Sequence, residues 1–314
     1  MATFIVRRLL SSVIVLFFVT LIGFTITHVL PGDPAASVLG ETATQESYLQ
    51  LREEMGLNEP LVAQYRDWVT SALRLDFGQT FRESTSVRTE LLERLPPTLE
   101  LGFLSLLVSF SGGILLGMTA ALNRNGPLDH VARLLGVFGV ATPNFWFGML
   151  LIVIVAVKLD LLPAFGYVPF TEDPVENLKR MIMPVLAISL GQLAVIVRMT
   201  RGTMIEVLEE DYVRTAKAKG LRRLVILQRH ALKNGMIPVL TVAGLQVARV
   251  VGGAAVTETV FAIPGVGRLA AEAVQFHEYN VVQAVILLSA VVIICSNMLV
   301  DIAYGWLDPR IRVS

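Results

Sequence analysis

The residues from Asp211 to Gly220 are the part of the sequence whose types and spacing most clearly indicate a functional site. They form a charged stretch between two long apolar runs, and further arginines and lysines follow as far as Lys233. A segment this basic cannot remain in hydrocarbon, so it must form a sizeable loop on one side of a membrane. Because Lys and Arg accumulate on cytoplasmic loops beside membrane spans, we expect this loop to be cytoplasmic and to serve as a docking site.

The same stretch carries a helical pattern. Apolar or small residues recur at helical spacing from Ile205 to Ala216, and a leucine stripe continues after Gly220. Glycine readily takes the left-handed conformation that ends a helix. We therefore expect two short amphipathic helices joined at Gly220. Such a pair can insert into a groove of another protein or lie on anionic lipid, and the pattern leaves both open.

Two ionisable residues within one apolar run are candidates for the lining of a path. Arg249 lies near the middle of the run from Ile237 to Val260, and Glu258 lies at its outer end. An arginine at this depth should face water, a partner helix or an acid. It would bind a carboxylate of a transported molecule or pair with an acid of a partner chain. Glu258 would receive an amino group or contact water as an interfacial acid.

Prolines predict breaks in two other places. Pro143 removes a backbone donor inside an apolar run, so the helix should kink or break there, and Asn144 would then line a path or bond to a neighbouring helix. Pro264, Gly265 and Gly267 forbid a continuing helix, so the chain should fold back at the outer mouth. The candidates for a gate in this turn are Phe261, Pro264 and Gly265.

Composition and motifs argue against several classes of function. The net charge is zero, with 26 Lys and Arg against 26 Asp and Glu, so the global basic excess of a nucleic-acid-binding protein is missing. The four histidines are scattered without the spacing of a metal site or of a nucleophile with its base. Gly-Lys-Ser and Gly-Lys-Thr do not occur, so the chain has no P-loop for ATP phosphates. We expect neither an enzyme nor a bound cofactor or metal, and any ATP-driven step must use a partner.

Hydropathy places the chain in a membrane. Hydrophobic residues make up 54% of it, charged residues only 17%, and the mean hydropathy is +0.64. The apolar runs have the length of about 20 residues that a helix needs to cross about 30 Å of hydrocarbon. We therefore predict an all-α polytopic membrane protein with six transmembrane helices. The expected spans are Leu9 to Leu30, Thr98 to Leu122, Val131 to Val157, Met181 to Thr203, Ile237 to Val260, and Val281 to Trp306.

Charge also predicts the sidedness of these spans. With six spans, Arg7 and Arg8, Arg124, the basic loop and the arginines near the C-terminus fall on one side, which should be the cytoplasm. Both termini are then cytoplasmic, and the acidic segment 31–97 lies outside as a small helical cap. Within that cap, Pro60 should begin a helix, and Asp76-Phe77-Gly78 should form a turn.

The stretch Arg214-Thr215-Ala216-Lys217-Ala218-Lys219-Gly220 resembles the cytoplasmic "EAA" coupling loop of ATP-binding cassette (ABC) importer permeases, in the form found in the dipeptide, oligopeptide and nickel permease family. This sequence departs from the broader motif at two positions, since Arg214 stands where that motif has an acid and Lys233 stands where it ends in proline. Further segments resemble the family in order and spacing over nearly the whole chain. They are 30–34, 56–61, 76–78, 94–99, 143–146, 261–267 and 307–310.

This resemblance implies a type I ABC importer permease fold and an inner-membrane permease subunit. It implies a second, similar permease, two ATPase domains that hold ATP and Mg, and an extracytoplasmic binding protein as partners, with membrane lipid around the spans. The coupling residues would be Asp211, Tyr212 and Arg214 to Gly220. Peptides are the expected cargo, with nickel and glutathione-like molecules as alternatives on the same scaffold. A secondary transporter would need no ATPase, but the sequence shows neither a clear repeat nor a central acid.

The expected organisation follows from these assignments. Residues 1–30 form the cytoplasmic N-terminus and the first span, and residues 31–97 form the extracytoplasmic cap. Residues 98–306 form a core of five transmembrane helices that includes the coupling loop 204–236. Residues 307–314 form a cytoplasmic tail.

Overall fold

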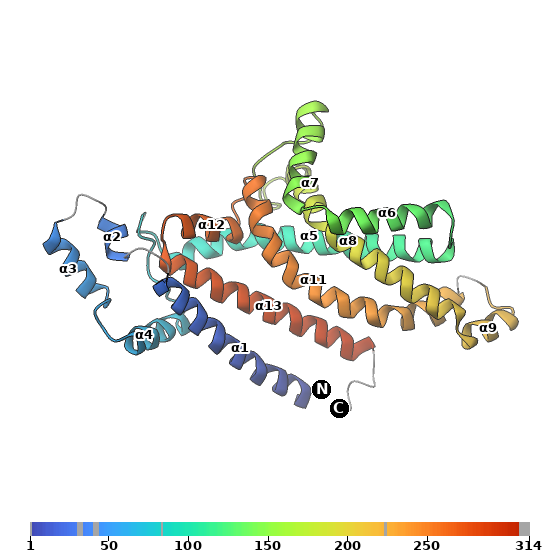
Figure 1. Cartoon of the computed structure of the whole chain (residues 1–314), viewed down its shortest axis with the longest axis horizontal. Coiled ribbons are helices and arrows are strands. Elements are labelled where there is room, and N and C mark those ends of the chain that lie inside the picture. The colour runs from blue at the N-terminus through green and yellow to red at the C-terminus, as the bar shows by residue number, and fades with distance from the viewer. Residues whose placement is uncertain (1, 30–33, 40–43, 83, 223–224, 308–314) are drawn as a thin grey trace. The chain divides into compact units, whose positions relative to one another are not determined.

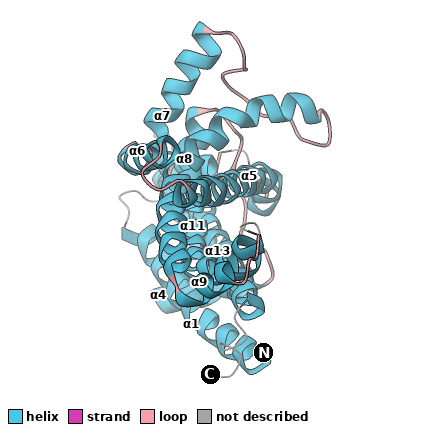
Figure 2. Ribbon diagram, turned by 90° about the vertical axis from the view of Figure 1, so that its right-hand side faces the viewer, coloured by secondary structure: helices cyan, strands magenta, loops and turns pink. Residues whose placement is uncertain are grey.

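The computed structural model describes residues 2–29, 34–39, 44–82, 84–222 and 225–307. Within these ranges the regular elements are all helices (Figure 2), and only an isolated bridge between Gln79 and Ser86 has β geometry. The predicted all-α class is therefore confirmed. The chain divides into two compact units, a central unit of Leu99–Ile263 with Cys295–Ser314, and an N-terminal unit of Ala2–Thr98 with Pro264–Ile294.

The central unit is organised around one long helix, α8, on which α6, α7 and α11 pack (Figure 1). Its buried core contains Met181, Met183 and Ile188 of α8, beside Leu101 and Phe261. The elements of this unit are α5 (Val87–Leu122, from Leu99 onward), α6 (Pro127–Ala141), α7 (Asn144–Leu151), the π-helical segment η1 (Ile152–Lys158), α8 (Pro174–Glu209), α9 (Asp211–Ala218), the π-helical segment η2 (Ile226–Ala231), α11 (Leu232–Val260) and the end of α13 (Tyr279–Leu307).

Small residues allow the backbones in this unit to approach closely. A Cβ added at Gly117 of α5 would lie 2.6 Å from the Cβ of Thr200 and 2.8 Å from the carbonyl oxygen of Val197, both on α8. A Cβ at Gly139 of α6 would lie 2.8 Å from the carbonyl oxygen of Leu190. Packing through small residues is typical of helices in membranes, where lipid gives no hydrophobic drive for helices to associate.

The helices agree with most of the expected spans. Among the described residues, four helical stretches are long and apolar enough to cross a membrane, namely Arg8–Val29, Val87–Leu122, Pro174–Glu209 and Tyr279–Leu299. A fifth candidate is the pair Pro127–Ala141 and Asn144–Lys158, which is bent by 108°. This bend lies at Pro143, so the predicted break is confirmed. The helix α11 covers the fifth expected span but is not among these stretches, so the count of six stays a prediction.

The N-terminal unit contains a helical segment where the cap was expected. Thr44 caps the first turn of α3 by accepting a hydrogen bond from the amide of Ser47 at 3.3 Å, and Gly56 follows that helix with a φ of +67°. Pro60 precedes α4, and Asp76 accepts from the amide of Gly78 at 3.0 Å, so the predicted helix start and turn are confirmed. The elements are α1 (Ala2–Val29), α2 (Pro34–Leu39), α3 (Gln45–Glu54), α4 (Leu61–Leu73), the start of α5, α12 (Val266–Gln275) and the start of α13.

Aromatic and polar contacts join α4 to α1 in this unit. The ring centroids of Phe24 and Tyr65 lie 5.4 Å apart, and the hydroxyls of Thr20 and Tyr65 share a hydrogen bond of 2.9 Å. At the start of α13, the carboxylate of Glu278 accepts hydrogen bonds from the amides of Phe81 and Arg82 at 2.7 and 2.9 Å. These contacts fix the segment between α4 and α5 on the helices of the same unit.

Candidate functional site

The helix α9 buries one face and exposes the other. Val213 and Ala216 are buried, and they pack with Ile226 of η2 and Leu208 of α8. This narrow apolar stripe anchors the helix on the central unit. The remaining predicted coupling residues of α9 and of the turn after it are exposed, namely Asp211, Tyr212, Arg214, Thr215, Lys217, Ala218, Lys219 and Gly220.

A left-handed glycine ends α9, as the sequence predicts. Gly220 has a φ of +75°, its amide donates to the carbonyl oxygen of Lys217 at 3.0 Å, and the amide of Leu221 donates to that of Ala216 at 3.3 Å. This pair of bonds is a Schellman motif, which satisfies carbonyls that the helix end leaves free. The direction in which the chain leaves α9 is therefore set by Gly220.

The second of the two short helices expected around Gly220 is not a separate element. Among the described residues after Gly220, helical structure is present at Val225 and continues through η2 directly into α11. No glycine or proline interrupts the chain from Val225 to Leu232, so the helical hydrogen bonding runs on into the membrane helix. In the described residues, the helical structure after Gly220 is therefore the start of the membrane helix, and the expectation of a second short helix is wrong.

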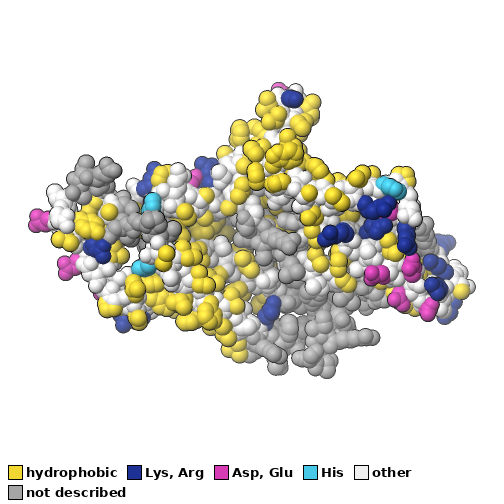
Figure 3. Space-filling view, viewed as in Figure 1, with side chains coloured by type: hydrophobic (Ala, Val, Ile, Leu, Met, Phe, Trp, Pro, Cys, Tyr) yellow, Lys and Arg dark blue, Asp and Glu magenta, His cyan; other side chains and the backbone are white. Residues whose placement is uncertain are grey.

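The charges of α9 lie in the order that the helix dipole favours. Asp211 is in the first turn and Lys217 in the last, and Arg214 pairs with Asp211 at 3.3 Å across one exposed turn. Figure 3 shows Lys, Arg, Asp and Glu side chains gathered at the end of the central unit that holds α9, in contrast to the hydrophobic cover of α7. The arrangement suits recognition of a charged partner, because the charged groups are solvated and their backbone is fixed.

An apolar hollow of about 490 Å³ adjoins α9. It includes Lys217 and Leu221 from the coupling segment and Leu208 from the end of α8. A partner that meets the basic face of α9 would thus find apolar surface next to it. The lining is completed by Ala121, Leu122, Ile226 and Leu227.

Of the candidate path residues, Asn144 belongs to α7 and Phe261 packs against α7. Asn144 starts α7, directly after the break. A Cβ placed on Gly253 of α11 would lie 3.5 Å from Nδ2 of Asn144. A Cβ placed on Gly191 of α8 would lie 3.7 Å from Oδ1 of Asn144. Phe261 follows α11, and its ring lies 3.0 Å from the Cβ position of Gly148. The structure therefore brings the helix break and the end of α11 to the same short helix.

The two charged candidates of α11 have different outcomes. The side chain of Arg249 lies outside the described residues, so its role as a path residue or a structural partner stays a prediction. Glu258 is fully buried, and its backbone carbonyl accepts from the amide of Ile263 at 2.8 Å. Its burial in this chain disagrees with the interpretation of Glu258 as an interfacial acid in contact with water.

The turn after α11 is shorter than expected. Pro264 is exposed and Gly265 is buried at the start of α12, both in the N-terminal unit. The helix does not continue, as expected, because α11 ends at Val260, but Gly267, which was expected within the turn, lies inside α12. A new helix begins there because Gly265 is extended and the hydroxyl of Thr98 accepts from the amide of Val266 at 2.8 Å, which satisfies a free donor of the first turn.

The loop between η1 and α8 forms hydrogen bonds with the residue after α11 and with α5. The amide of Gly166 donates to the carbonyl oxygen of Phe261 at 2.9 Å, and the hydroxyl of Tyr167 donates to Glu100 at 2.7 Å. Burial, followed by the hydrogen bond to Glu100, raises the pKa of Tyr167 above its usual value. Tyr167 is therefore a neutral donor at physiological pH and keeps this contact.

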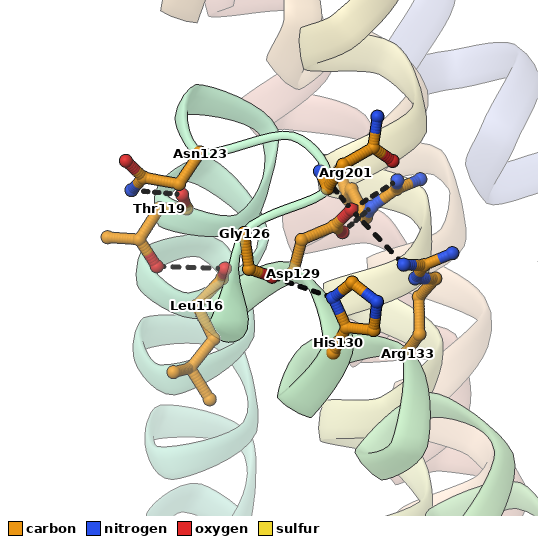
Figure 4. Close-up of polar contacts among 9 residues, drawn as sticks. Leu116, Thr119, Asn123, Gly126, Asp129, His130, Arg133 and Arg201 are labelled. Carbon is orange, nitrogen blue, oxygen red and sulfur yellow. Dashed lines mark hydrogen bonds and ion pairs between the residues drawn. The ribbon is translucent and has the colours of Figure 1, made fainter.

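A buried ion pair that the sequence did not predict joins α6 to α8. The carboxylate of Asp129 is fully buried and accepts hydrogen bonds from Nε and Nη2 of Arg201, the latter at 3.0 Å (Figure 4). The amide of Asn125 donates to the same carboxylate at 2.9 Å, and Arg133 approaches it to 3.7 Å. One partial signal was available, since Arg201 is a charge within an expected span. Nothing in the sequence pairs it with an acid 72 residues away.

No group of three or more His, Cys, Asp or Glu side chains within the described ranges is placed to hold a metal ion. The arrangement as a whole is that of a helical membrane protein with a charged helix beside its spans and a broken helix within them.

Comparison with known proteins places this fold in a family. Residues 113–313 match the family described as "Binding-protein-dependent transport system inner membrane component", and residues 1–102 match the corresponding N-terminal family. The chain belongs to the binding-protein-dependent transport system inner membrane component family. The resemblance seen in its motifs is confirmed, and the chain is a multi-pass inner-membrane permease subunit of the ABC type.

Relatives are similar along the whole chain. A protein of Sinorhizobium fredii described as a probable peptide ABC transporter permease, y4tP, is 39% identical over 99% of this chain and 100% of its own length. The dipeptide transport system permease protein DppB of Escherichia coli K12 is also 39% identical, with 99% of each chain covered. Among solved structures, an inward-facing form of the MetNI methionine ABC transporter has a TM-score of 0.55 at 17% identity, covering 69% of this chain and 96% of that one. The last likeness is one of fold.

Proposed function

We propose that this chain is one of two permease subunits of an ATP-driven importer of peptides. A second, similar permease completes the translocation path, and two partner ATPase domains bind ATP and Mg. An extracytoplasmic binding protein delivers the cargo. ATP binding and hydrolysis by the partners move α9, and the spans then open alternately to each side of the membrane.

The observation that carries this proposal is the construction of α9. Its apolar stripe, Val213 and Ala216, fixes it to α8 and η2, and Gly220 fixes where it ends. Its basic residues are exposed and take no part in that anchoring. A helix built in this way transmits a push from a docked protein, because the exposed face binds while the buried face moves the membrane helices. Binding to anionic lipid at the membrane surface would require only the exposed basic residues and not the buried apolar stripe.

Peptide cargo is supported by the relatives. Two proteins 39% identical over nearly the full chain carry peptide and dipeptide transport in their names. Nickel and glutathione-like cargo stay as alternatives, since members of the family with this scaffold differ in what their binding proteins deliver.

The proposed topology has six spans with both termini in the cytoplasm. Arg124 of the α5–α6 loop forms an ion pair of 2.7 Å with Glu209, the last residue of α8, and only Glu210 separates Glu209 from α9. The loop and α9 thus lie at the same end of the central unit. This supports the charge-based assignment of both to the cytoplasmic side.

The proposed path runs past the break in the third span. Asn144 lies beside Gly191 and Gly253, so a polar amide sits where three helices meet. The helix α11 carries Arg249 along its length and Glu258 near its end, and Phe261 follows it directly. We place the gate at the turn from Phe261 to Gly265. A broken helix can change its angle at low cost, because its backbone bonds are already interrupted.

Affinity purification of the tagged chain from its native membrane in mild detergent tests the proposal. We expect an ATPase and a second permease to copurify, and the ATPase to be lost with Lys217→Glu and with Gly220→Pro. Proline cannot adopt the left-handed φ of Gly220, so the second variant misdirects α9 without changing a charge. Lys179→Glu is the matched control, because Lys179 is exposed near the start of α8, about 45 Å from its end at about 1.5 Å per residue.

Two results would contradict the proposal. Isolation of the chain alone, or as a homo-oligomer in intact extracts, would favour a self-contained transporter. Loss of the ATPase with Lys179→Glu as readily as with Lys217→Glu would show that docking depends on overall charge and not on α9.

A further inference from the structure

Two ion pairs connect the start of α6 and the loop before it to the last third of α8. Asp129 bonds with Arg201, and Arg124 bonds with Glu209 at 2.7 Å. The second pair is exposed, with both side chains more than half accessible. In the first pair the carboxylate of Asp129 is fully buried, so water does not compete for it, while the side chain of Arg201 is 23% exposed.

The buried pair has one geometry. The guanidinium of Arg201 meets the two carboxylate oxygens of Asp129 with Nε and Nη2, a fork that fixes orientation as well as distance. The amide of Asn125 takes a further position on the carboxylate. A buried carboxylate cannot give up these donors without remaining unsatisfied, so α6 and α8 cannot slide past one another at this point.

The far end of α6 is held on α8 as well. The Cβ position of Gly139 lies 2.7 Å from the Cβ of Ala194 and 2.8 Å from the carbonyl oxygen of Leu190. Only Pro143 and its neighbour Thr142 separate the end of α6 from Asn144. Because α6 is fixed on α8 at both ends, a displacement of α8 is carried to the break that precedes α7.

The other end of this connection is α9. Helix α8 ends at Glu209 and α9 begins at Asp211, with Glu210 alone between them. We propose that Asp129 and Arg201 form a coupling latch, a pair of positioning residues that makes α6 follow α8 when a partner displaces α9. The movement of α9 then reaches the polar break at Asn144 in the membrane. The inference rests on the proposed function, since it assumes a partner that moves α9.

The test uses the complete complex, purified with its partners and reconstituted in proteoliposomes, and measures peptide uptake per ATP hydrolysed. In Asp129→Asn, the amide still accepts from Asn125, and Arg201, which is 23% exposed, can turn to water, so the complex should assemble. We expect ATP hydrolysis to persist and uptake per ATP to fall about tenfold, in the range of an ordinary coupling free energy. Arg201→Lys keeps the charge but not the fork, and it should give a smaller fall of the same kind.

The matched control is Arg133→Ala. Arg133 is near the same carboxylate but lies on α6 itself, so its removal takes away a charge without cutting the link to α8. We expect its uptake per ATP to equal that of the wild type. A fall as large as that of Asp129→Asn would overturn the latch, because the effect would then follow from the local charge and not from the link.

A second measurement separates a latch from a structural contact. A fluorophore on a cysteine that replaces the exposed Met149 of α7, in a Cys295→Ser background, should respond to a non-hydrolysable ATP analogue in the wild type and not in Asp129→Asn. If Asp129→Asn lowers only the yield of complex, and the remaining complexes keep the wild-type response and uptake per ATP, the latch is overturned and the pair is structural. A wild-type complex without ATP-dependent uptake would overturn the proposed function, and the latch with it.

Discussion

Two of the Asp–Arg ion pairs among the described residues of the central unit differ in almost every physical respect. In α9, Asp211 and Arg214 lie one turn apart, 3.3 Å from each other, with side chains 94% and 70% exposed. At the latch, Asp129 and Arg201 come from different helices, with side chains 0% and 23% exposed. The first pair is solvated, whereas the second is positioned by the packing of two helices and helps to keep those helices together.

The difference teaches that the same residue types can serve recognition or position. An exposed pair contributes little to stability, because solvent and salt screen it, and its charges stay available to a partner. A buried pair must be kept together, because separating it leaves an unsolvated charge. We therefore expect changes at α9 to affect docking more than stability, and changes at the latch to affect stability and coupling together.

The largest effect on stability should come from removing one half of the buried pair. Arg201→Met leaves the Asp129 carboxylate buried without its main partner, and we expect a cost of about 3–5 kcal/mol. Thermal unfolding of the purified complex measures it, with Arg201→Lys as the variant that keeps the charge. A loss no greater than that of Arg214→Met would remove the distinction between the two pairs.

A smaller loss is expected where α6 touches α8 at its other end. In Gly139→Val, added atoms meet the backbone of Leu190, and overpacking of this kind costs about 1–3 kcal/mol. Gly136→Val is the matched control on the same helix, since the Cβ position of Gly136 is 3.9 Å from its nearest neighbour, the carbonyl oxygen of Ala194. Equal melting temperatures of the two variants would show that α6 is not fixed at this end.

The end of α9 should be less sensitive. Gly220→Ala has open space for a Cβ but must adopt a φ of +75°, so we expect a destabilisation of about 1–2 kcal/mol confined to the helix end. Faster amide exchange at Leu221 would report it. Gly202→Ala, within α8 and equally open, should instead stabilise its helix. If both substitutions raise stability, the left-handed end is not what directs the chain out of α9.

The smallest effect on stability is expected for Arg214→Ala. The exposed pair with Asp211 is lost, and we expect no measurable shift in the melting temperature. Binding of the partner ATPase should weaken, and its dependence on salt should decrease, because one solvated charge no longer contributes. An unchanged affinity at low salt would place the docking contact elsewhere on α9.

Sequence patterns predicted the features that depend on local chemistry. Pro143 breaks the third span because it lacks a backbone donor, and Gly220 ends α9 because it accepts a left-handed φ. The same reasoning correctly ended α11 before the turn that follows it but wrongly placed Gly267 in that turn, since Gly267 lies inside α12, where the hydroxyl of Thr98 accepts a hydrogen bond from the first turn. It was also wrong for the second short helix, because η2 continues into α11.

The sequence by itself determined the class of the protein, most of its membrane spans and the basic stretch from Asp211 to Gly220, since hydropathy, charge and turn chemistry act over short distances. Only the tertiary structure decided which charges meet. Asp129 and Arg201 are 72 residues apart, and Asn144 faces Gly253 from 109 positions away. Such pairs depend on how α6 and α11 pack on α8. The small residues through which these helices pack form no sequence pattern that shows which helix they contact.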